Sequence, residues 1–174
     1  MEQWKNIDTV YNGTVFRVKT GEVTLDDGTV AQREIVEHPG GVGVVPFDGT
    51  HVILVRQYRI AIQKDILEIP AGKREGDEDP ASCGMRELIE ETGYRAESMV
   101  SAGSVFATVG YCSEKIHLYL AFDLTHVGQD LDEEERIELV RMSLDEVRHG
   151  LKEHRFEDAK TVVALHALLQ HLDG

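Results

Sequence analysis

The chain has little cysteine, little proline, few aromatic residues and a shortage of positive charge. Its 174 residues include two cysteines, four prolines and 6% aromatic residues. Cys83 and Cys112 give neither a disulfide framework nor the spacing of a metal-ligand set, so we predict that both are free thiols. Lys and Arg number 18 against 32 Asp and Glu, which gives a formal net charge of −14. Nucleic-acid polymers are bound through surplus Lys and Arg, so this balance argues against such a partner.

Long apolar runs are also missing. No stretch approaches the roughly 20 apolar residues that a membrane-spanning helix needs, so we expect no membrane partner. The segment MEQWKNIDTV lacks a basic region followed by an apolar core, so secretion is not indicated and the cytoplasm is the expected location. A hydrophobic fraction of 41% with 29% charged residues is ordinary for one globular domain.

Strand patterns fill the first third of the chain. Residues 6–24 alternate between polar and apolar, and Asp26-Asp27-Gly28 predicts a turn into a second strand over 29–38. We therefore predict a β-hairpin over residues 1–38, ahead of a main domain over residues 39–174. Further strands are expected in the main domain at 42–46, 51–58, 66–69, 97–105, 114–123 and 137–142.

Helical patterns interrupt these strands. Asp79 is a good N-cap and Gly93 a C-terminal stop, so a helix is predicted from about Pro80 to Thr92. The capping box at residues 143–146 opens a short second helix. A third helix is predicted over residues 157–172. Its apolar stripe comprises Val162, Val163, Leu165, Leu168 and Leu169. The fold class is therefore α/β.

The first predicted helix carries three glutamates on one face. Glu87, Glu90 and Glu91 lie three and four residues apart, with Arg86 at helical spacing from Glu90. Carboxylates placed in this way repel one another unless a cation lies between them. Hard oxygen ligands suit Mg²⁺ or Mn²⁺, which also bind substrate phosphates. An acidic protein that handles phosphates must recruit metal cations, and this helix offers a site for them.

These residues resemble a known signature. The order Gly72, five residues, Glu78, seven residues, then RELIEETGY from Arg86 is similar to the box of the Nudix hydrolases, which cleave a nucleoside diphosphate linked to another group. Every defined polar position matches, whereas Tyr94 stands where an aliphatic residue is more usual. An exposed acidic helix is the alternative, but it explains neither the glycine loop nor the spacing. The resemblance implies a Nudix α/β/α sandwich with a mixed sheet, preceded by the N-terminal β-hairpin.

Segments outside the box are similar to one branch of this family. REIVEHPGGVGVVP from Arg33, VRQYR from Val55 and LEIPAG from Leu67 resemble the hydrolases of ADP-ribose and nucleoside diphosphate sugars. In that branch the hairpin commonly exchanges between subunits, so the resemblance implies a homodimer, while an edge hairpin on a monomer is the plain alternative. The residues that match substrate contacts are Arg33, Glu34, Arg59 and Glu114. A surface salt bridge is the alternative for the first three.

One departure concerns the substrate. Val109 occupies a position where ADP-ribose hydrolases usually carry a proline, and its absence permits a different loop around the terminal sugar. The base and the sugar therefore stay open.

The resemblance also implies metal ligands. They are the Ala71 carbonyl and the carboxylates of Glu87, Glu90, Glu91 and Glu135. Arg86 would orient the glutamates and Glu78 would support them. The implied cofactor is Mg²⁺, with Mn²⁺ as a substitute.

The acidic run from Asp130 to Glu138 precedes a strand, where this branch has a catalytic loop. Glu133 matches a general base, and Glu134 could be base or ligand. A solvated loop is the alternative. The implied reaction is metal-assisted in-line attack of water on a pyrophosphate. A hydrolase of modified nucleoside triphosphates and a catalytically silent nucleotide sensor remain the competing hypotheses.

Overall fold

The structure, a computed structural model, describes residues 1–131 and 136–174. These residues form two compact units. The first contains Met1–Gly40 and Phe106–Lys115, and the second contains Gly41–Val105 and Ile116–Gly174. A loop from beyond the first helix therefore belongs with the N-terminal residues.

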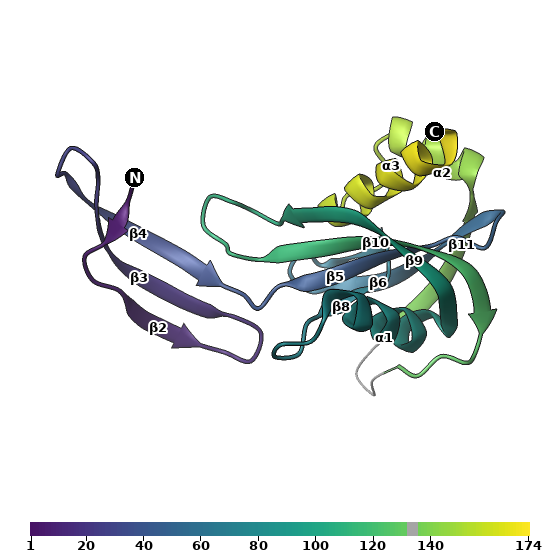
Figure 1. The fold of residues 1–174 in the computed structure, drawn as a ribbon, viewed down its shortest axis with the longest axis horizontal. Helices are drawn as coiled ribbons and strands as arrows, with labels where there is room; N and C mark the ends of the chain where they lie inside the picture. Colours follow the sequence, from purple (N-terminus) through teal and green to yellow (C-terminus); the bar gives the residue numbers. More distant parts are fainter. Residues whose placement is uncertain (132–135) are drawn as a thin grey trace. The chain divides into compact units, whose positions relative to one another are not determined.

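A four-stranded antiparallel sheet forms most of the first unit (Figure 1). Its strands are β1 (Gln3–Trp4), β2 (Asp8–Asn12), β3 (Arg17–Thr24) and β4 (Val30–Glu37), and β3 pairs with each of the others. The expected turn at Gly28 is confirmed, with φ of 85° and an N–H that donates to Leu25 O. The prediction of one strand over 6–24 is wrong. The chain reverses between Asn12 and Arg17, where Gly13 N donates to Phe16 O at 3.1 Å.

The loop from Phe106 to Lys115 lies along β4 within the same unit. Val36 N donates to Tyr111 O at 2.7 Å, and Ser113 N donates to Val36 O at 2.9 Å. His38 N donates to the Ser113 hydroxyl at 3.0 Å. These bonds attach the loop to the last residues of the N-terminal sheet.

Two sheets form the second unit. In one, β5 (Gly41–Pro46) lies between β8 (Ala71–Lys73) and β10 (Lys115–His126), with β9 (Tyr94–Phe106) beside β10. The pairing of β5 with β10 is parallel and that with β8 antiparallel, so the sheet is mixed. In the other, β6 (His51–Arg59) lies between β7 (Lys64–Glu68) and β11 (Ile137–Ser143). The predicted strands exist with bounds shifted by a few residues. Among the described strands of this unit, β8 was not predicted, because its three residues carry no strand pattern.

The helices of the described chain begin and end at capping residues. The prediction for α1 (Pro80–Thr92) is confirmed, since Asp79 accepts from Ser82 N and Gly93 has φ of 72°. The capping box of α2 (Leu144–Lys152) is also confirmed. The third helix, α3 (Ala159–Asp173), begins two residues later than predicted because Asp158 is its N-cap. The predicted stripe is wrong at Val163, which is 41% exposed, because the helical register buries Ala164 instead.

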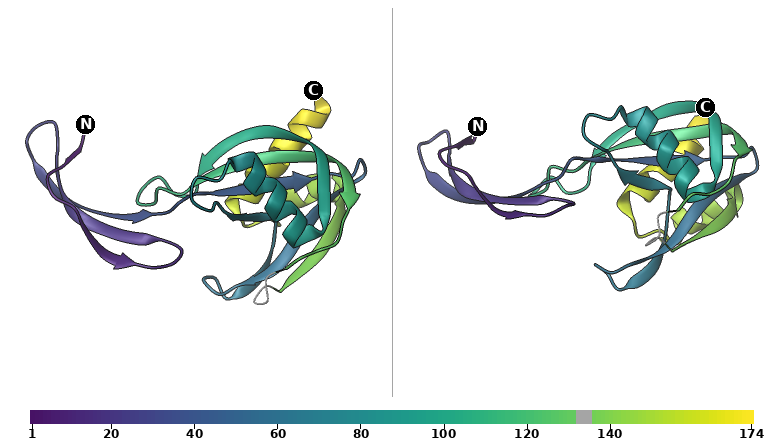
Figure 2. Two further views of the ribbon diagram at one scale, coloured as in Figure 1. Left: turned by 60° about the horizontal axis from the view of Figure 1, so that its bottom comes forward. Right: turned by 90° about the horizontal axis from the view of Figure 1, so that it is seen from below.

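Helices cover both faces of the strands in the second unit. Figures 1 and 2 show α1 on one side of β5 and α3 on the other. Val42 and Val44 of β5 share a buried cluster with Leu88 of α1. Val45 shares the larger cluster with Leu165 and other residues of α3. The expected α/β/α sandwich is therefore confirmed. In the described parts of the chain, no helix has the length and apolar character to cross a membrane.

Candidate active site

The first residues of β8 and one face of α1 meet at a cluster of carboxylates. Glu87 and Glu91 are buried, at 9% and 3% exposure, and Glu90 is half-buried. A Cβ atom on Gly72 would lie 1.9 Å from the carboxyl carbon of Glu87. A side chain at this position would therefore displace the Glu87 carboxylate, which occupies that space. Ala71 N donates to Glu91 Oε2 at 3.0 Å, which fixes β8 against the helix.

Arg86 holds three carboxylates together. Its Nη1 donates to Glu87 Oε1 at 2.8 Å and to Glu90 Oε2 at 2.9 Å. Its Nε and Nη2 donate to the two oxygens of Glu78, each at 3.1 Å. Hydrogen bonding from Arg86 lowers the pKa of Glu78 to about 2. The same bonds raise the pKa of Arg86 itself. The predicted pairing of Arg86 with the helix glutamates is thus present, and Glu78 is its strongest partner.

The neighbouring thiol of Cys83 contacts this charge cluster, since Arg86 Nη2 donates to Cys83 Sγ at 3.5 Å. Cys83 is a free cysteine, as Cys112 is, and it is fully buried in α1. Burial raises the pKa of the Cys83 thiol to about 12. The thiol therefore stays protonated at neutral pH and is a weak nucleophile.

A cavity of about 260 Å³ opens in front of these groups. Its lining includes Lys73 and Glu75, which the sequence had not singled out, and Asp130, the first residue of the acidic run. Asp130 N donates to Glu90 O at 3.1 Å, so the start of the acidic run is tied to α1. The remaining lining residues are Ala71, Gly72, Arg86, Glu87 and Glu90.

The groups around this cavity fit a divalent cation. Among residues 1–131 and 136–174, no three His, Cys, Asp or Glu side chains already converge on one point as metal ligands. Arg86 is the cation between Glu87 and Glu90 in this arrangement. The donors are hard carboxylate oxygens, and Gly72 leaves room for one of them beside the strand. Hard oxygen donors beside an open cavity suit Mg²⁺ or Mn²⁺.

Arg59 lies in a second charged cluster within the same unit. Its Nε and Nη2 donate to the two oxygens of Glu68 at 2.6 and 2.9 Å. Glu68 is 2% exposed and also accepts from Lys160. Sequence reasoning missed Glu68 and Lys160. The available signal was a lone carboxylate within the apolar run ILEIPAG.

The other predicted substrate contacts belong to the first unit. Arg33 forms a fork with Glu2, with Nε to Oε2 at 2.9 Å and Nη2 to Oε1 at 2.5 Å. Glu34 is exposed on β4. Glu114 Oε1 lies 3.6 Å from His38 Nδ1, which also accepts from Gly40 N. Whether these residues bind substrate stays a prediction.

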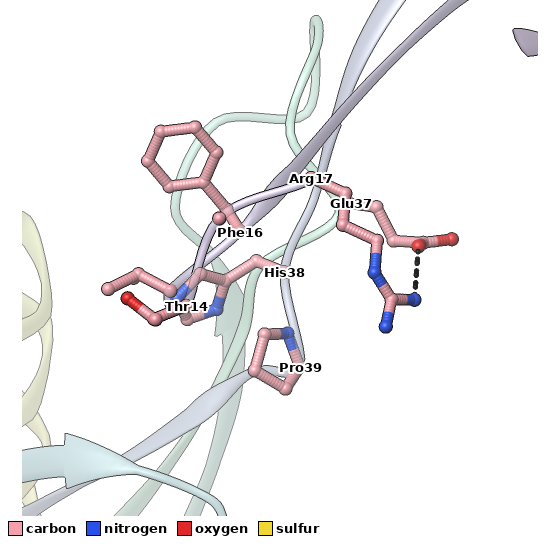
Figure 3. A pocket seen from close by; sticks show the side chains of 8 residues that line it. Thr14, Phe16, Arg17, Glu37, His38 and Pro39 are labelled. Carbon is pink, nitrogen blue, oxygen red and sulfur yellow. Dashed lines mark hydrogen bonds and ion pairs between the residues drawn. The ribbon is translucent and has the colours of Figure 1, made fainter. Parts of the chain in front are cut away.

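His38 also lines a cavity of about 310 Å³ within the first unit (Figure 3). The ring of Phe16 and the ion pair between Arg17 and Glu37 border the same cavity, and the pair measures 3.3 Å. Glu114 thus contacts a residue that lines this cavity.

The loop predicted to supply the base has no described geometry at its centre. Glu133, Glu134 and Glu135 lie outside the described residues. Their assignment as base or metal ligand therefore stays a prediction.

Comparison with known proteins identifies the family. The family model described as NUDIX domain matches residues 37–165. The chain belongs to this family. It is 40% identical to the methanol dehydrogenase activator of Bacillus methanolicus, over 92% of this chain and 89% of that protein. It is 34% identical to the ADP-ribose pyrophosphatase of Bacillus subtilis (strain 168), over 92% of this chain and 89% of that protein.

Two further Nudix relatives have informative names. The chain is 33% identical to the GDP-mannose pyrophosphatase of Cronobacter sakazakii, over 92% of this chain and 88% of that protein. A crystal structure of ADP compounds hydrolase matches with a TM-score of 0.88 and 26% identity. That match covers 99% of this chain and 95% of the solved one. The similarity to that solved structure therefore includes the residues of the N-terminal sheet, which precede the matched NUDIX domain.

Proposed function

We propose that this Nudix protein hydrolyses the pyrophosphate bond of ADP-ribose or a related nucleoside diphosphate sugar. Water is consumed, the bond between one phosphorus and the bridging oxygen breaks, and the products are a nucleoside monophosphate and a sugar phosphate. The main support is the carboxylate cluster at α1, where Arg86 gathers Glu87 and Glu90 beside a cavity that Gly72 keeps open. Three of the named relatives hydrolyse compounds of this class.

The cofactor in this proposal is Mg²⁺, with Mn²⁺ as a substitute. Nudix hydrolases generally depend on a divalent metal. A cation held by Glu87, Glu90 and Glu91, with the Ala71 carbonyl, would neutralise charge on the phosphates and activate water. Glu135 would complete the ligand set. The homodimer and the cytoplasmic location are further parts of the proposal.

The side chains of this protein then orient the metal ligands, accept the proton and bind the substrate. Arg86 orients Glu87 and Glu90 through Nη1 and is itself held by Glu78. A glutamate of the acidic loop, Glu133 in the first place, takes the proton of the attacking water. Arg59 donates to the diphosphate, as its match to the branch implies. Arg33, Glu34 and Glu114 contact the rest of the nucleotide.

A product-resolved screen with Mg²⁺ tests this proposal. The substrates are ADP-ribose, GDP-mannose, UDP-glucose, NADH, diadenosine polyphosphates and nucleoside triphosphates. NADH is included because a pyrophosphate bond joins its two nucleotides. In addition, one relative is named for activating a dehydrogenase. We expect turnover of at least one nucleoside diphosphate sugar to the two phosphomonoesters. Preferential cleavage of triphosphates would favour the competing enzyme hypothesis. Binding without turnover of any compound would favour a silent sensor.

A further inference from the structure

A buried charge network joins Arg59 to the first turn of α3. Glu68 Oε1 accepts from Arg59 Nε at 2.6 Å, and Glu68 Oε2 accepts from Arg59 Nη2 at 2.9 Å. Lys160 Nζ donates to the same Oε2 at 2.5 Å and lies 3.0 Å from Asp158 Oδ2. The two positive charges of this network therefore equal its two negative charges in number. This balance matters because a buried carboxylate that loses a partner is strongly destabilising.

The network fixes the orientation of the Arg59 guanidinium. The planar fork of an arginine has its geometry set once two of its nitrogens bind one carboxylate. Nε and Nη2 are used in this way, and within residues 1–131 and 136–174 the Nη1 group donates to no acceptor. The Arg59 side chain is 42% exposed, so a ligand can reach part of it.

Electrostatics link this guanidinium to the carboxylates of α1. Hydrogen bonding to Glu68 raises the pKa of Arg59 against the opposing effect of burial, and the charge of Glu91 contributes to the increase. Burial alone would raise the pKa of Glu68. The hydrogen bond from Arg59 and the charge of Lys160 outweigh it, and the pKa of Glu68 is lowered. Arg59 is therefore charged and within electrostatic range of the proposed metal site.

The same turn of α3 also holds the backbone that leads to β8. Thr161 Oγ1 accepts from Ile69 N at 2.9 Å, and the Thr161 hydroxyl donates to Asp158 Oδ2 at 2.5 Å. Two residues further along, Ala71 N donates to Glu91. The first turn of α3 thus supports both the side chain of Glu68 and the strand segment beside the carboxylates.

We propose that Glu68 and Lys160 are positioning residues that orient Arg59 so that its Nη1 group faces the diphosphate of the substrate. This inference rests on the proposed function. Lys160 neutralises part of the negative charge of Glu68. The positive potential of Arg59 at an anionic ligand is therefore higher than it would be if Glu68 paired with Arg59 alone. Lys160 also tethers the carboxylate that sets the plane of the guanidinium.

The first experiment compares two lysine variants in Mg²⁺ with ADP-ribose as substrate. Lys160→Met removes the charge from the network and keeps an apolar stem. Lys64→Met is the matched control, because Lys64 of β7 pairs with Glu157 just before α3, at 2.6 and 2.7 Å, but in an exposed position. We expect KM to rise about tenfold in Lys160→Met with kcat within about twofold, because a binding contact is weakened uniformly. Lys64→Met should match the wild type.

A double-mutant cycle tests whether Lys160 acts through Arg59. In an Arg59→Met background, Lys160→Met should have no further effect on KM. An equal increase of KM in both backgrounds would overturn the inference, as would a wild-type KM in Lys160→Met. If Lys160→Met does not fold, the cycle is run with Glu68→Gln/Lys160→Met, which removes the buried carboxylate together with its lysine partner.

A measurement without substrate separates this inference from the proposed function. Nitrogen-15 NMR follows hydrogen exchange at Arg59 Nε, assigned through the Arg59→Met variant. We expect exchange to be several times faster in Lys160→Met and unchanged in Lys64→Met. Unchanged exchange in Lys160→Met would overturn the positioning role even if the wild type is active. Absence of wild-type turnover on every substrate would overturn the proposed function instead.

Discussion

The guanidinium of Arg86 binds both carboxylate oxygens of Glu78, eight residues earlier in the chain, at 3.1 Å each. Its remaining nitrogen, Nη1, binds Glu87 and Glu90. Glu78 therefore anchors the loop before α1 and, at the same time, aims the arginine at the proposed metal site. This arrangement explains why a glutamate outside the helix belongs to the family signature.

The first prediction concerns acid stability. The pKa of Glu78 falls from an ordinary 4.5 to about 2 in the folded protein. A carboxyl group with a depressed folded pKa stabilises the fold fully above pH 4.5 and loses this contribution as pH falls towards 2. We expect Glu78→Gln to melt below the wild type at pH 7 and to show a shallower fall in Tm between pH 4.5 and 2. Calorimetry across this range measures both. The exposed Glu157→Gln is the control, and an identical slope in Glu78→Gln and wild type would contradict the prediction.

The second prediction concerns the space beside β8. In Gly72→Ala the new methyl group would fall on the Glu87 carboxyl group, so that flexible side chain must move. We expect turnover to fall roughly a hundredfold, in the range found when a metal site is disturbed. The fold should survive. The matched comparison is Gly72→Ala in a Glu87→Ala background, where the steric conflict is gone and Tm should not fall further. A wild-type rate for Gly72→Ala would show that Glu87 need not occupy this position.

Local signals made α1 predictable, whereas the support of the site is long-range. Asp79 and Gly93 each bond within a few residues, so the sequence alone locates both helix ends. Lys160 and Glu68 are 92 residues apart, and no local pattern indicates that contact. The chain reversal after Asn12 is a different case, because Asn-Gly is a strong hairpin signal that alternation over residues 6–24 concealed.

A similar limit applied to the cavity lining. Asp130 reaches α1 because the residues after β10 bond to the C-terminal end of this helix. There Val127 N donates to Gly93 O at 2.7 Å. Such a contact depends on where the strand ends in space. The sequence indicated an acidic run there, but not which of its members would face the carboxylates.

The third prediction tests Glu91. Its Oε2 accepts from Ala71 N, and the amide oxygen of a glutamine can accept the same bond. Glu91→Gln should therefore fold, and the metal-free variant should melt no lower than wild type, because repulsion on the helix face is reduced. Turnover should fall roughly a hundredfold or more and Mn²⁺ affinity in parallel, as a metal-binding charge is lost. Titration calorimetry with Mn²⁺ and steady-state rates give the two readouts. Unchanged turnover would reject the site assignment.

The fourth prediction concerns the N-terminal residues. Deletion of residues 1–38 would remove the bonds from Val36 to Tyr111 and Ser113 and the apolar surface of the first unit. If this segment exchanges between subunits, the shortened chain should aggregate and lose activity. Light scattering of the full-length protein is the direct check and should give the mass of a dimer. A monomer mass, or an active shortened chain, would contradict the proposed homodimer.

The last prediction separates the roles of three neighbouring glutamates in the acidic loop. A general base acts in the chemical step, so Glu133→Gln should lower kcat by roughly a hundredfold to ten-thousandfold and leave substrate affinity nearly unchanged. Loss of a metal ligand has a different signature, and Glu135→Gln should also raise the Mg²⁺ concentration for half-maximal rate. Glu134→Gln, expected to change little, is the matched control. Near wild-type rates for all three variants at saturating Mg²⁺ would contradict the prediction and favour the alternative, in which the acidic run is a solvated loop without a catalytic role. The base would then be sought at Glu114, which lies beside His38.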